Sequence, residues 1–335
     1  MAKSRAYFQR ALPPALSDLT DLAIDLRWTT SILTRGLWKS LDPETWERTE
    51  NPFLILTNVS QERLEAAAQD PEFLAQLQWC REKREEYVQR RGWFADNLPN
   101  CPLQSIAYFS MEFGLSESLP IYSGGLGMLA GDHLKSASDL GVPLVGIGLL
   151  YQQGYFRQVL ATDGSQLEAF PYNDPSSLPI EPLCTKDGTW LRIPLPLPGR
   201  VLLSRVWQAR IGRVRLYLLD SNDPMNHPWD RGITANLYAA GREARLLQEM
   251  LLGLGGWRLL ETLGLEPQVC HLNEGHAAFA VLARAMGVAL LGQTLSASEA
   301  LALGLVNSVF PADLLSAEVE AIADRLRELV HLYQR

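Results

Sequence analysis

The spacing of apolar residues divides the chain into a helical first part and a second part in which strands and helices alternate. Residues 15–95 have helical spacing, and Asp70-Pro71 is a strong helix start, because a capping side chain precedes a proline at the first helical position. The apolar residues behind this start share one helical face: Phe73, Leu77, Cys80 and Tyr87. We therefore predict a helical N-terminal segment over residues 1–100.

From Ser105 the pattern becomes strand, helix, strand. Ile106–Phe109 and Val142–Tyr151 are predicted to be buried strands, with a helix from about Gly127 to Leu140 between them. This order predicts two parallel strands joined by a crossover helix.

The same alternation resumes later in the chain. The predicted elements are a strand over Val214–Leu219, a long helix over Thr234–Leu263, a strand over Gln268–Leu272 and a helix over His276–Ala285. Residues 101–285 are thus predicted to form a doubly wound, Rossmann-like α/β lobe.

Residues 152–213 interrupt the alternation. Short strand-like runs are separated there by four turn pairs: Asp163-Gly164, Asp187-Gly188, Pro198-Gly199 and Ile211-Gly212. Such spacing predicts antiparallel hairpins, which we interpret as a β insertion in the α/β lobe.

Composition narrows the class of protein. The 335 residues are 47% apolar and 20% charged, as in ordinary globular proteins, and the net charge of −8 argues against a nucleic-acid partner. The four cysteines are scattered without a CxxC motif, which argues against a zinc site and against a disulfide framework. No signal peptide and no membrane-spanning apolar run is apparent, so we expect a soluble, cytoplasmic protein with no membrane partner.

The most informative motif is the glycine-rich loop that opens the first predicted helix of the lobe. Gly124, Gly125 and Gly127 suit a tight turn whose backbone amides face a phosphate at a helix N-terminus. The alternative is that these glycines only allow close packing of helix and strand. Glu112 comes after a buried strand, so it is expected near the edge of the sheet where α/β proteins place ligands, or else as a solvated loop carboxylate.

A second polar cluster comes after the last predicted strand. Asn273, Glu274 and His276 are delivered to the same edge as the glycine loop. A single histidine at a strand end is more often structural, but two polar clusters that converge on one edge favour a binding site. The chain has no G-x-S-x-G nucleophile motif and no paired metal motif, so we expect no metal.

These residues resemble the α-glucan phosphorylases, in particular their shorter bacterial and archaeal branch. The resemblance extends over about residues 10–285. It is carried by IAYFSMEFGL (106–115), YSGGLG (122–127), DHLKSASDLG (132–141), GYFRQ (154–158), DRGIT (230–234), RLLQE (245–249) and HLNEGH (271–276).

The resemblance implies the lobe of a two-lobed glycosyltransferase that releases terminal α-1,4-linked glucose from a glucan, with orthophosphate, as glucose 1-phosphate. It implies pyridoxal phosphate as cofactor and leaves a homodimer open. By the same resemblance, Gly124, Gly125 and Gly127 bind phosphate or cofactor, and His276 and Glu112 belong to the catalytic centre. Asn273, Glu274 and His276 are implied to contact the glucan.

The family attaches its cofactor to a lysine in a second, C-terminal lobe. Only Lys3, Lys39, Lys83, Lys135 and Lys186 occur here, and none comes after Lys186. Lys135 lies on the helix behind the glycine loop, where a solvated or ion-paired lysine is the better interpretation. We therefore expect a truncated phosphorylase that is inactive alone.

Residues 286–335 depart from the phosphorylase pattern and resemble the C-terminal part of the enoyl-CoA hydratase (crotonase) family. Ser296 and Glu299 form a capping box, and a helical tail is predicted. The junction suggests a fusion of two truncated genes.

Two alternatives stay open. One is a non-catalytic glucan- or phosphate-binding remnant, or a fusion pseudogene product. The other is a nucleotide-sugar glucosyltransferase, which is disfavoured because those enzymes resemble this loop but carry a lysine where the chain has Ser123.

Overall fold

The computed structural model describes residues 10–290 and Leu314. The predicted tail elements, including the capping box at Ser296, lie outside these residues. The chain divides into two units, residues 1–283 and residues 284–335. Apart from the end of the last helix, the described helices and strands belong to the first unit.

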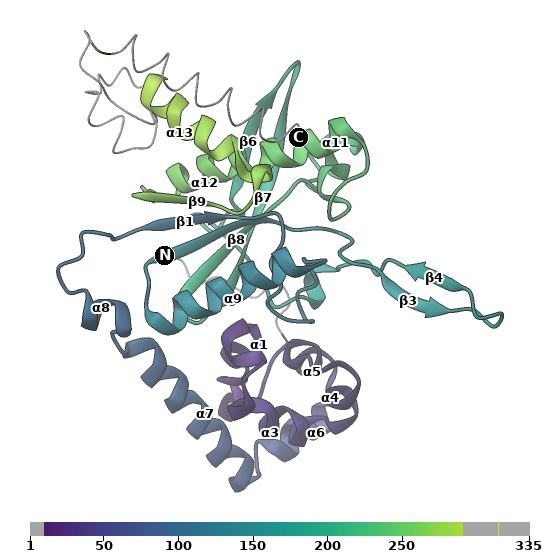
Figure 1. The fold of residues 1–335 in the computed structure, drawn as a ribbon. Coiled ribbons are helices and arrows are strands. Elements are labelled where there is room, and N and C mark those ends of the chain that lie inside the picture. The colour runs from purple at the N-terminus through teal and green to yellow at the C-terminus, as the bar shows by residue number, and fades with distance from the viewer. Residues whose placement is uncertain (1–9, 291–313, 315–335) are drawn as a thin grey trace, which may run out of the picture. The chain divides into compact units, whose positions relative to one another are not determined.

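Helices fill the first part of the chain, as predicted (Figure 1). They are η1 (Pro14–Leu16), α1 (Leu19–Ile24), α2 (Leu26–Thr29), α3 (Ile32–Leu41), α4 (Pro43–Thr49), α5 (Pro52–Asn58), α6 (Gln61–Ala67), α7 (Pro71–Gln89) and α8 (Trp93–Asn97). Asp70 caps α7 by accepting a hydrogen bond from the Glu72 N–H, which confirms the predicted start. These helices enclose an apolar cluster of their own, which includes Phe73, Leu77 and Cys80.

The second part is built on a seven-stranded mixed sheet with the order β5-β7-β8-β2-β1-β9, in which β6 pairs with β7. The strands of the described residues are β1 (Ile106–Phe109), β2 (Leu144–Leu149), β3 (Arg157–Leu160), β4 (Gln166–Ala169), β5 (Glu181–Pro182), β6 (Arg192–Leu197), β7 (Arg200–Ile211), β8 (Val214–Asp220) and β9 (Val269–Leu272). As predicted, β1 and β2 are parallel, and β1 also pairs with β9 in parallel.

The remaining described helices lie between these strands or follow the last of them. They are α9 (Gly125–Leu140), η2 (Pro175–Ser177), α10 (Pro228–Arg231), η3 (Gly232–Thr234), α11 (Arg242–Met250), the π-helical turn η4 (Leu251–Gly255), α12 (Gly256–Thr262), η5 (Gly275–Ala277) and α13 (Phe279–Leu290). Helices cover both faces of the sheet, since two neighbouring residues of β2 lie beside different helices. Gly146 lies so close to Leu134 of α9 that a Cβ at Gly146 would touch it. Ile147 lies similarly close to Gly256 of α12.

Most of the predicted β insertion forms part of the main sheet of the lobe. β5, β6 and β7 join the main sheet, because β7 pairs antiparallel with β8 up to the predicted turn at Ile211-Gly212. By contrast, β3 and β4 form a separate two-stranded hairpin, which stands away from the sheet in Figure 1.

The long helix predicted over Thr234–Leu263 is wrong at its start. Regular helix begins only at Arg242, because Tyr238 and Gly241 have backbone φ angles of +56° and +93° and break the helical path. Gly264, with φ of +67°, ends the helix as expected.

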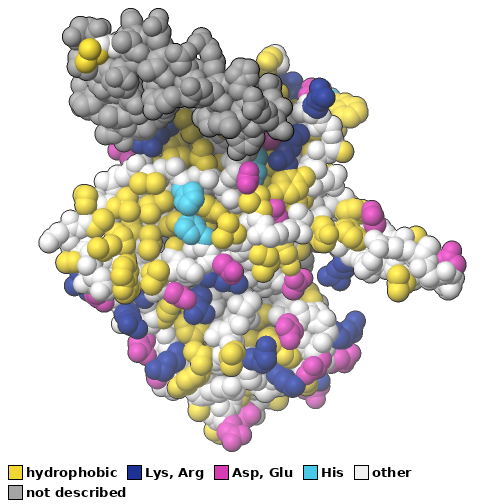
Figure 2. All heavy atoms as spheres, in the orientation of Figure 1, with side chains coloured by type: hydrophobic (Ala, Val, Ile, Leu, Met, Phe, Trp, Pro, Cys, Tyr) yellow, Lys and Arg dark blue, Asp and Glu magenta, His cyan; other side chains and the backbone are white. Residues whose placement is uncertain are grey.

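The surface carries charges of both signs. On the face drawn in Figure 2, Lys and Arg side chains are interspersed with Asp and Glu side chains. Among the helices of the described residues, none is long and apolar enough to cross a membrane.

Candidate functional site

The two polar clusters predicted from the sequence meet at the carboxyl ends of β1 and β9. Phe109, the last residue of β1, pairs with Leu272, the last residue of β9, so the two strands end side by side. His276 is buried, and its Nε2 accepts a hydrogen bond of 3.0 Å from the Met111 N–H. Asn273 is also buried and donates from Nδ2 to the Ser110 Oγ at 3.0 Å.

The imidazole of His276 is held neutral. Burial lowers its pKa, and the nearby positive charge of Arg245 lowers it further. Since Nε2 acts as an acceptor, the single proton of the neutral ring lies on Nδ1. The Nδ1–H group is therefore a donor that does not add charge to the site.

Glu112 lies between this edge and the glycine loop. Its carboxylate is buried, and Oε2 accepts hydrogen bonds from the Ser123 N–H at 2.6 Å and the Gly124 N–H at 3.3 Å. Of the two interpretations of Glu112, the solvated loop carboxylate is wrong. The amide of Gly124, predicted to face a phosphate, holds the protein's own carboxylate.

The three loop glycines differ in their surroundings. Gly124 and Gly125 are exposed, and a Cβ at either would meet nothing within 4 Å. As the first residue of the 16-residue helix α9, Gly125 has no intrahelical acceptor for its N–H. Gly127 is buried, and a Cβ there would lie 2.8 Å from Glu112 Oε2, so its role is close packing.

Three residues that the sequence argument did not assign complete this site. The hydroxyl of Tyr238 donates to Glu112 Oε1 at 2.5 Å. The guanidinium of Arg245 lies 4.6 Å from the centre of the Tyr238 ring and pairs with Glu249 at 2.8 Å. Arg245 and Glu249 lie four apart on α11, and this spacing could have indicated their ion pair, although not its place in the fold.

Glu274 has an unusual backbone. It is exposed, and its φ and ψ of 66° and 174° fall in a region that residues with a side chain rarely adopt. The bend carries the chain from Asn273 into the turn that holds His276.

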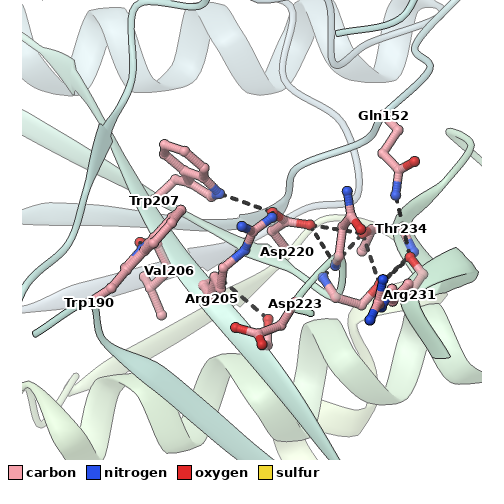
Figure 3. A network of polar contacts seen from close by, with 12 residues as sticks. Gln152, Trp190, Arg205, Val206, Trp207, Asp220, Asp223, Arg231 and Thr234 are labelled. Atoms are coloured by element: carbon pink, nitrogen blue, oxygen red, sulfur yellow. Dashed lines mark hydrogen bonds and ion pairs between the residues drawn. The ribbon is translucent and has the colours of Figure 1, made fainter. Parts of the chain in front are cut away.

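A polar network fixes the segment that leads from β8 toward α11 (Figure 3). Asp220, at the end of β8, accepts hydrogen bonds from the side chains of Arg205 at 2.7 Å and Trp207 at 3.1 Å. Asp220 also accepts from the Thr234 hydroxyl at 3.5 Å, and the Gln152 side chain donates to the Arg231 carbonyl oxygen at 3.4 Å. These contacts anchor the segment before Tyr238 to the sheet.

Lys135 is the described lysine that comes next after the glycine loop in the sequence, but it does not lie beside the loop. Lys135 lies ten residues beyond Gly125, about 15 Å along the helix axis. Burial lowers its pKa, and its charged neighbours are Asp132 and Arg27 rather than the loop. Within the described part of the chain, no group of three or more His, Cys, Asp or Glu side chains could hold a metal ion.

Comparisons with known proteins place these features in a family. A family model described as "Protein of unknown function (DUF3417)" matches residues 12–119. The maltodextrin phosphorylase of Thermococcus litoralis is 46% identical over 270 residues, which are 80% of this chain and 32% of the relative.

Two glycogen phosphorylases agree with this result. That of Mycobacterium tuberculosis is 43% identical over 296 residues, covering 83% of this chain and 34% of the relative. That of Aquifex aeolicus is 36% identical over 266 residues, covering 79% of this chain and 38% of the relative. The chain therefore spans well under half the length of these relatives, and over about four fifths of its own length it belongs to the glycogen phosphorylase family as an N-terminal segment.

Proposed function

We propose that this chain forms the phosphate- and glucosyl-binding lobe of a two-lobed α-glucan phosphorylase. The reaction would be phosphorolysis of a terminal α-1,4-linked glucose, with orthophosphate and glucan as substrates and glucose 1-phosphate as product. The observation that carries the proposal is the N–H of the exposed Gly125, which begins the long helix α9 and follows directly on the Ser123 and Gly124 amides that Glu112 holds.

The helix N-terminus supplies the anion-binding chemistry. The first amides of α9 point along the helix axis, and the helix dipole adds a partial positive charge at this end. Because Glu112 already occupies the amides of Ser123 and Gly124, we assign the phosphate to Gly125 and the first turn after it. Gly124 shapes the turn, and Gly127 allows the helix to approach Glu112.

The strand-end cluster would bind the sugar. The Nδ1–H of the neutral His276 is available to a glucosyl oxygen, and the exposed Glu274 carboxylate can accept from hydroxyl groups. The amide nitrogen of Asn273 is engaged by Ser110, so Asn273 would reach substrate only through its carbonyl oxygen.

Pyridoxal phosphate does not fit the lysines described here. Lys39 and Lys83 form surface ion pairs, Lys135 lies three helical turns from the loop, and Lys186 is exposed on the β insertion. We therefore place the attachment amine in a second lobe, and we expect no turnover from this chain by itself.

One amide donor tests the phosphate site. Gly125→Pro removes the N–H at the first helical position, where proline is tolerated, and the extended Gly124 before it suits proline. Loss of one hydrogen bond to a charged acceptor should weaken orthophosphate binding about tenfold or more, measured by ³¹P NMR titration. Gly125→Ala keeps the amide and should bind like the parent.

Equal affinities of the two variants would refute the phosphate site. Glucose 1-phosphate formed from maltodextrin, orthophosphate and pyridoxal phosphate by the chain alone would refute the need for a second lobe. If calorimetry detects neither phosphate nor maltodextrin binding, both the proposed function and the binding-remnant alternative fail, and the chain is a fusion pseudogene product.

A further inference from the structure

A buried side chain of α11 holds the irregular segment before that helix in place. Gln248 is completely buried, and its Nε2 donates to the carbonyl oxygens of Ile233 at 2.8 Å and Asn236 at 2.9 Å. Its Oε1 accepts from the Ala239 N–H at 3.1 Å. One side chain thus brackets the segment on both sides of Tyr238.

This bracket holds Tyr238 in a left-handed conformation, with φ of +56°. Arg245, three residues before Gln248, lies over the face of the Tyr238 ring, so the ring is fixed from α11 as well. Burial raises the pKa of the Tyr238 phenol well above its ordinary value, and the hydrogen bond to Glu112 raises it further. The hydroxyl is therefore a donor at neutral pH.

Glu112 connects this tyrosine to the glycine loop. Oε1 of its carboxylate accepts from the Tyr238 hydroxyl at 2.5 Å, whereas Oε2 accepts from the amides of Ser123 and Gly124. Glu112 is only 2% exposed, so Oε1 is shielded from bulk water and relies on the tyrosine as its hydrogen-bond partner.

We infer that Tyr238 is a positioning residue that sets the conformation of the glycine loop through Glu112. With one oxygen held by Tyr238, the carboxylate cannot rotate, and the other oxygen fixes the Ser123 and Gly124 amides. The direction of the next amide, that of Gly125, depends on theirs. The consequence for phosphate binding rests on the proposed function, whereas the link from Tyr238 through Glu112 to the loop amides does not.

Amide exchange tests the link without any ligand. In Tyr238→Phe, we expect the Ser123 and Gly124 amides to exchange with deuterium about tenfold faster or more, because their acceptor is no longer held. Exchange rates are measured by NMR and divided by those of the β2 amides of Ile147 and Leu149. A loss of global stability speeds exchange at both sets of amides and therefore leaves this ratio unchanged. Tyr155→Phe, on an exposed ring, is the matched control and should change nothing.

A second background isolates the route. If Tyr238 acts through Glu112, Tyr238→Phe should hardly change the loop exchange rates in a chain that already carries Glu112→Gln. If the two residues act independently, the rate increases caused by the two replacements should multiply. Multiplied effects, or loop exchange that rises only in step with the β2 amides, would overturn the inference. If the exchange result holds while orthophosphate still fails to bind the parent chain, the proposed function fails and the link stands.

Discussion

At the scale of single residues, the tightest backbone approach on α9 is at Gly131. A Cβ there would lie 2.0 Å from the carbonyl oxygen of Gly114, in the loop after β1. Backbone cannot move aside as a side-chain tip can, so Gly131→Ala should lower the free energy of unfolding by about 2–3 kcal/mol. Urea denaturation measures this change.

Gly125→Ala is the matched control on the same helix. Nothing lies within 4 Å of a Cβ at that position, so its unfolding midpoint should stay near that of the parent. If the two variants lost the same stability, the contact between α9 and the Gly114 loop would not be the cause.

The sequence placed the candidate residues at the strand ends and the glycine loop, but it did not show their partners. The strand ends and the glycine loop could be predicted, since they depend on apolar runs and turn residues near each other in the chain. The bond from Tyr238 to Glu112 joins residues 126 positions apart, and it depends on a left-handed tyrosine that no local pattern indicates. The packing role of Gly127 likewise needs the position of Glu112.

At the scale of elements, the β3–β4 hairpin is an appendage. All eight of its strand residues are exposed, including Leu160 at 71%. Replacing residues 158–168 by two glycines should change the free energy of unfolding by about 0.5 kcal/mol or less, measured by thermal and urea melts.

The β6–β7 hairpin provides the contrast. Leu195 of β6 is buried in the main apolar cluster, so Leu195→Ala should cost about 3 kcal/mol. A large loss on removing β3–β4 would mean that this hairpin packs in solution against something else.

Elements were predictable where local spacing decides them. The turn pairs correctly indicated hairpins, but they could not show that β7 pairs with β8 and so joins the main sheet, because strand pairing is decided by tertiary packing. The error over residues 235–241 has a similar cause. Gln248, outside that stretch, holds it in a non-helical path by accepting a hydrogen bond from the Ala239 N–H and donating one to the Asn236 carbonyl oxygen.

At the scale of the whole molecule, the N-terminal helices have an apolar cluster distinct from that of the sheet, apart from Leu26 of α2, which packs in the sheet's cluster, and a buried carboxylate also joins the two parts. Asp25 is completely buried, accepts from the Gly212 N–H at 2.8 Å and pairs with Arg84 at 3.3 Å. Asp25→Ala should cost about 3–5 kcal/mol, because it leaves buried partners unpaired. Calorimetry should then resolve two unfolding transitions in place of one.

Asp21 offers a matched control from the same helix region. It pairs with Arg210 at 2.9 Å, but its side chain is 54% exposed, so Asp21→Ala should cost about 1 kcal/mol or less. A single transition in Asp25→Ala would show that the two clusters remain coupled through other contacts.

The backbone at Glu274 has a wider consequence. Glycine would adopt that bend with less strain, and a glycine already stands next to it at position 275. A carboxylate therefore stands at a position where glycine would strain the backbone less. Backbone strain of this kind clusters at functional sites, which supports the role proposed for Glu274.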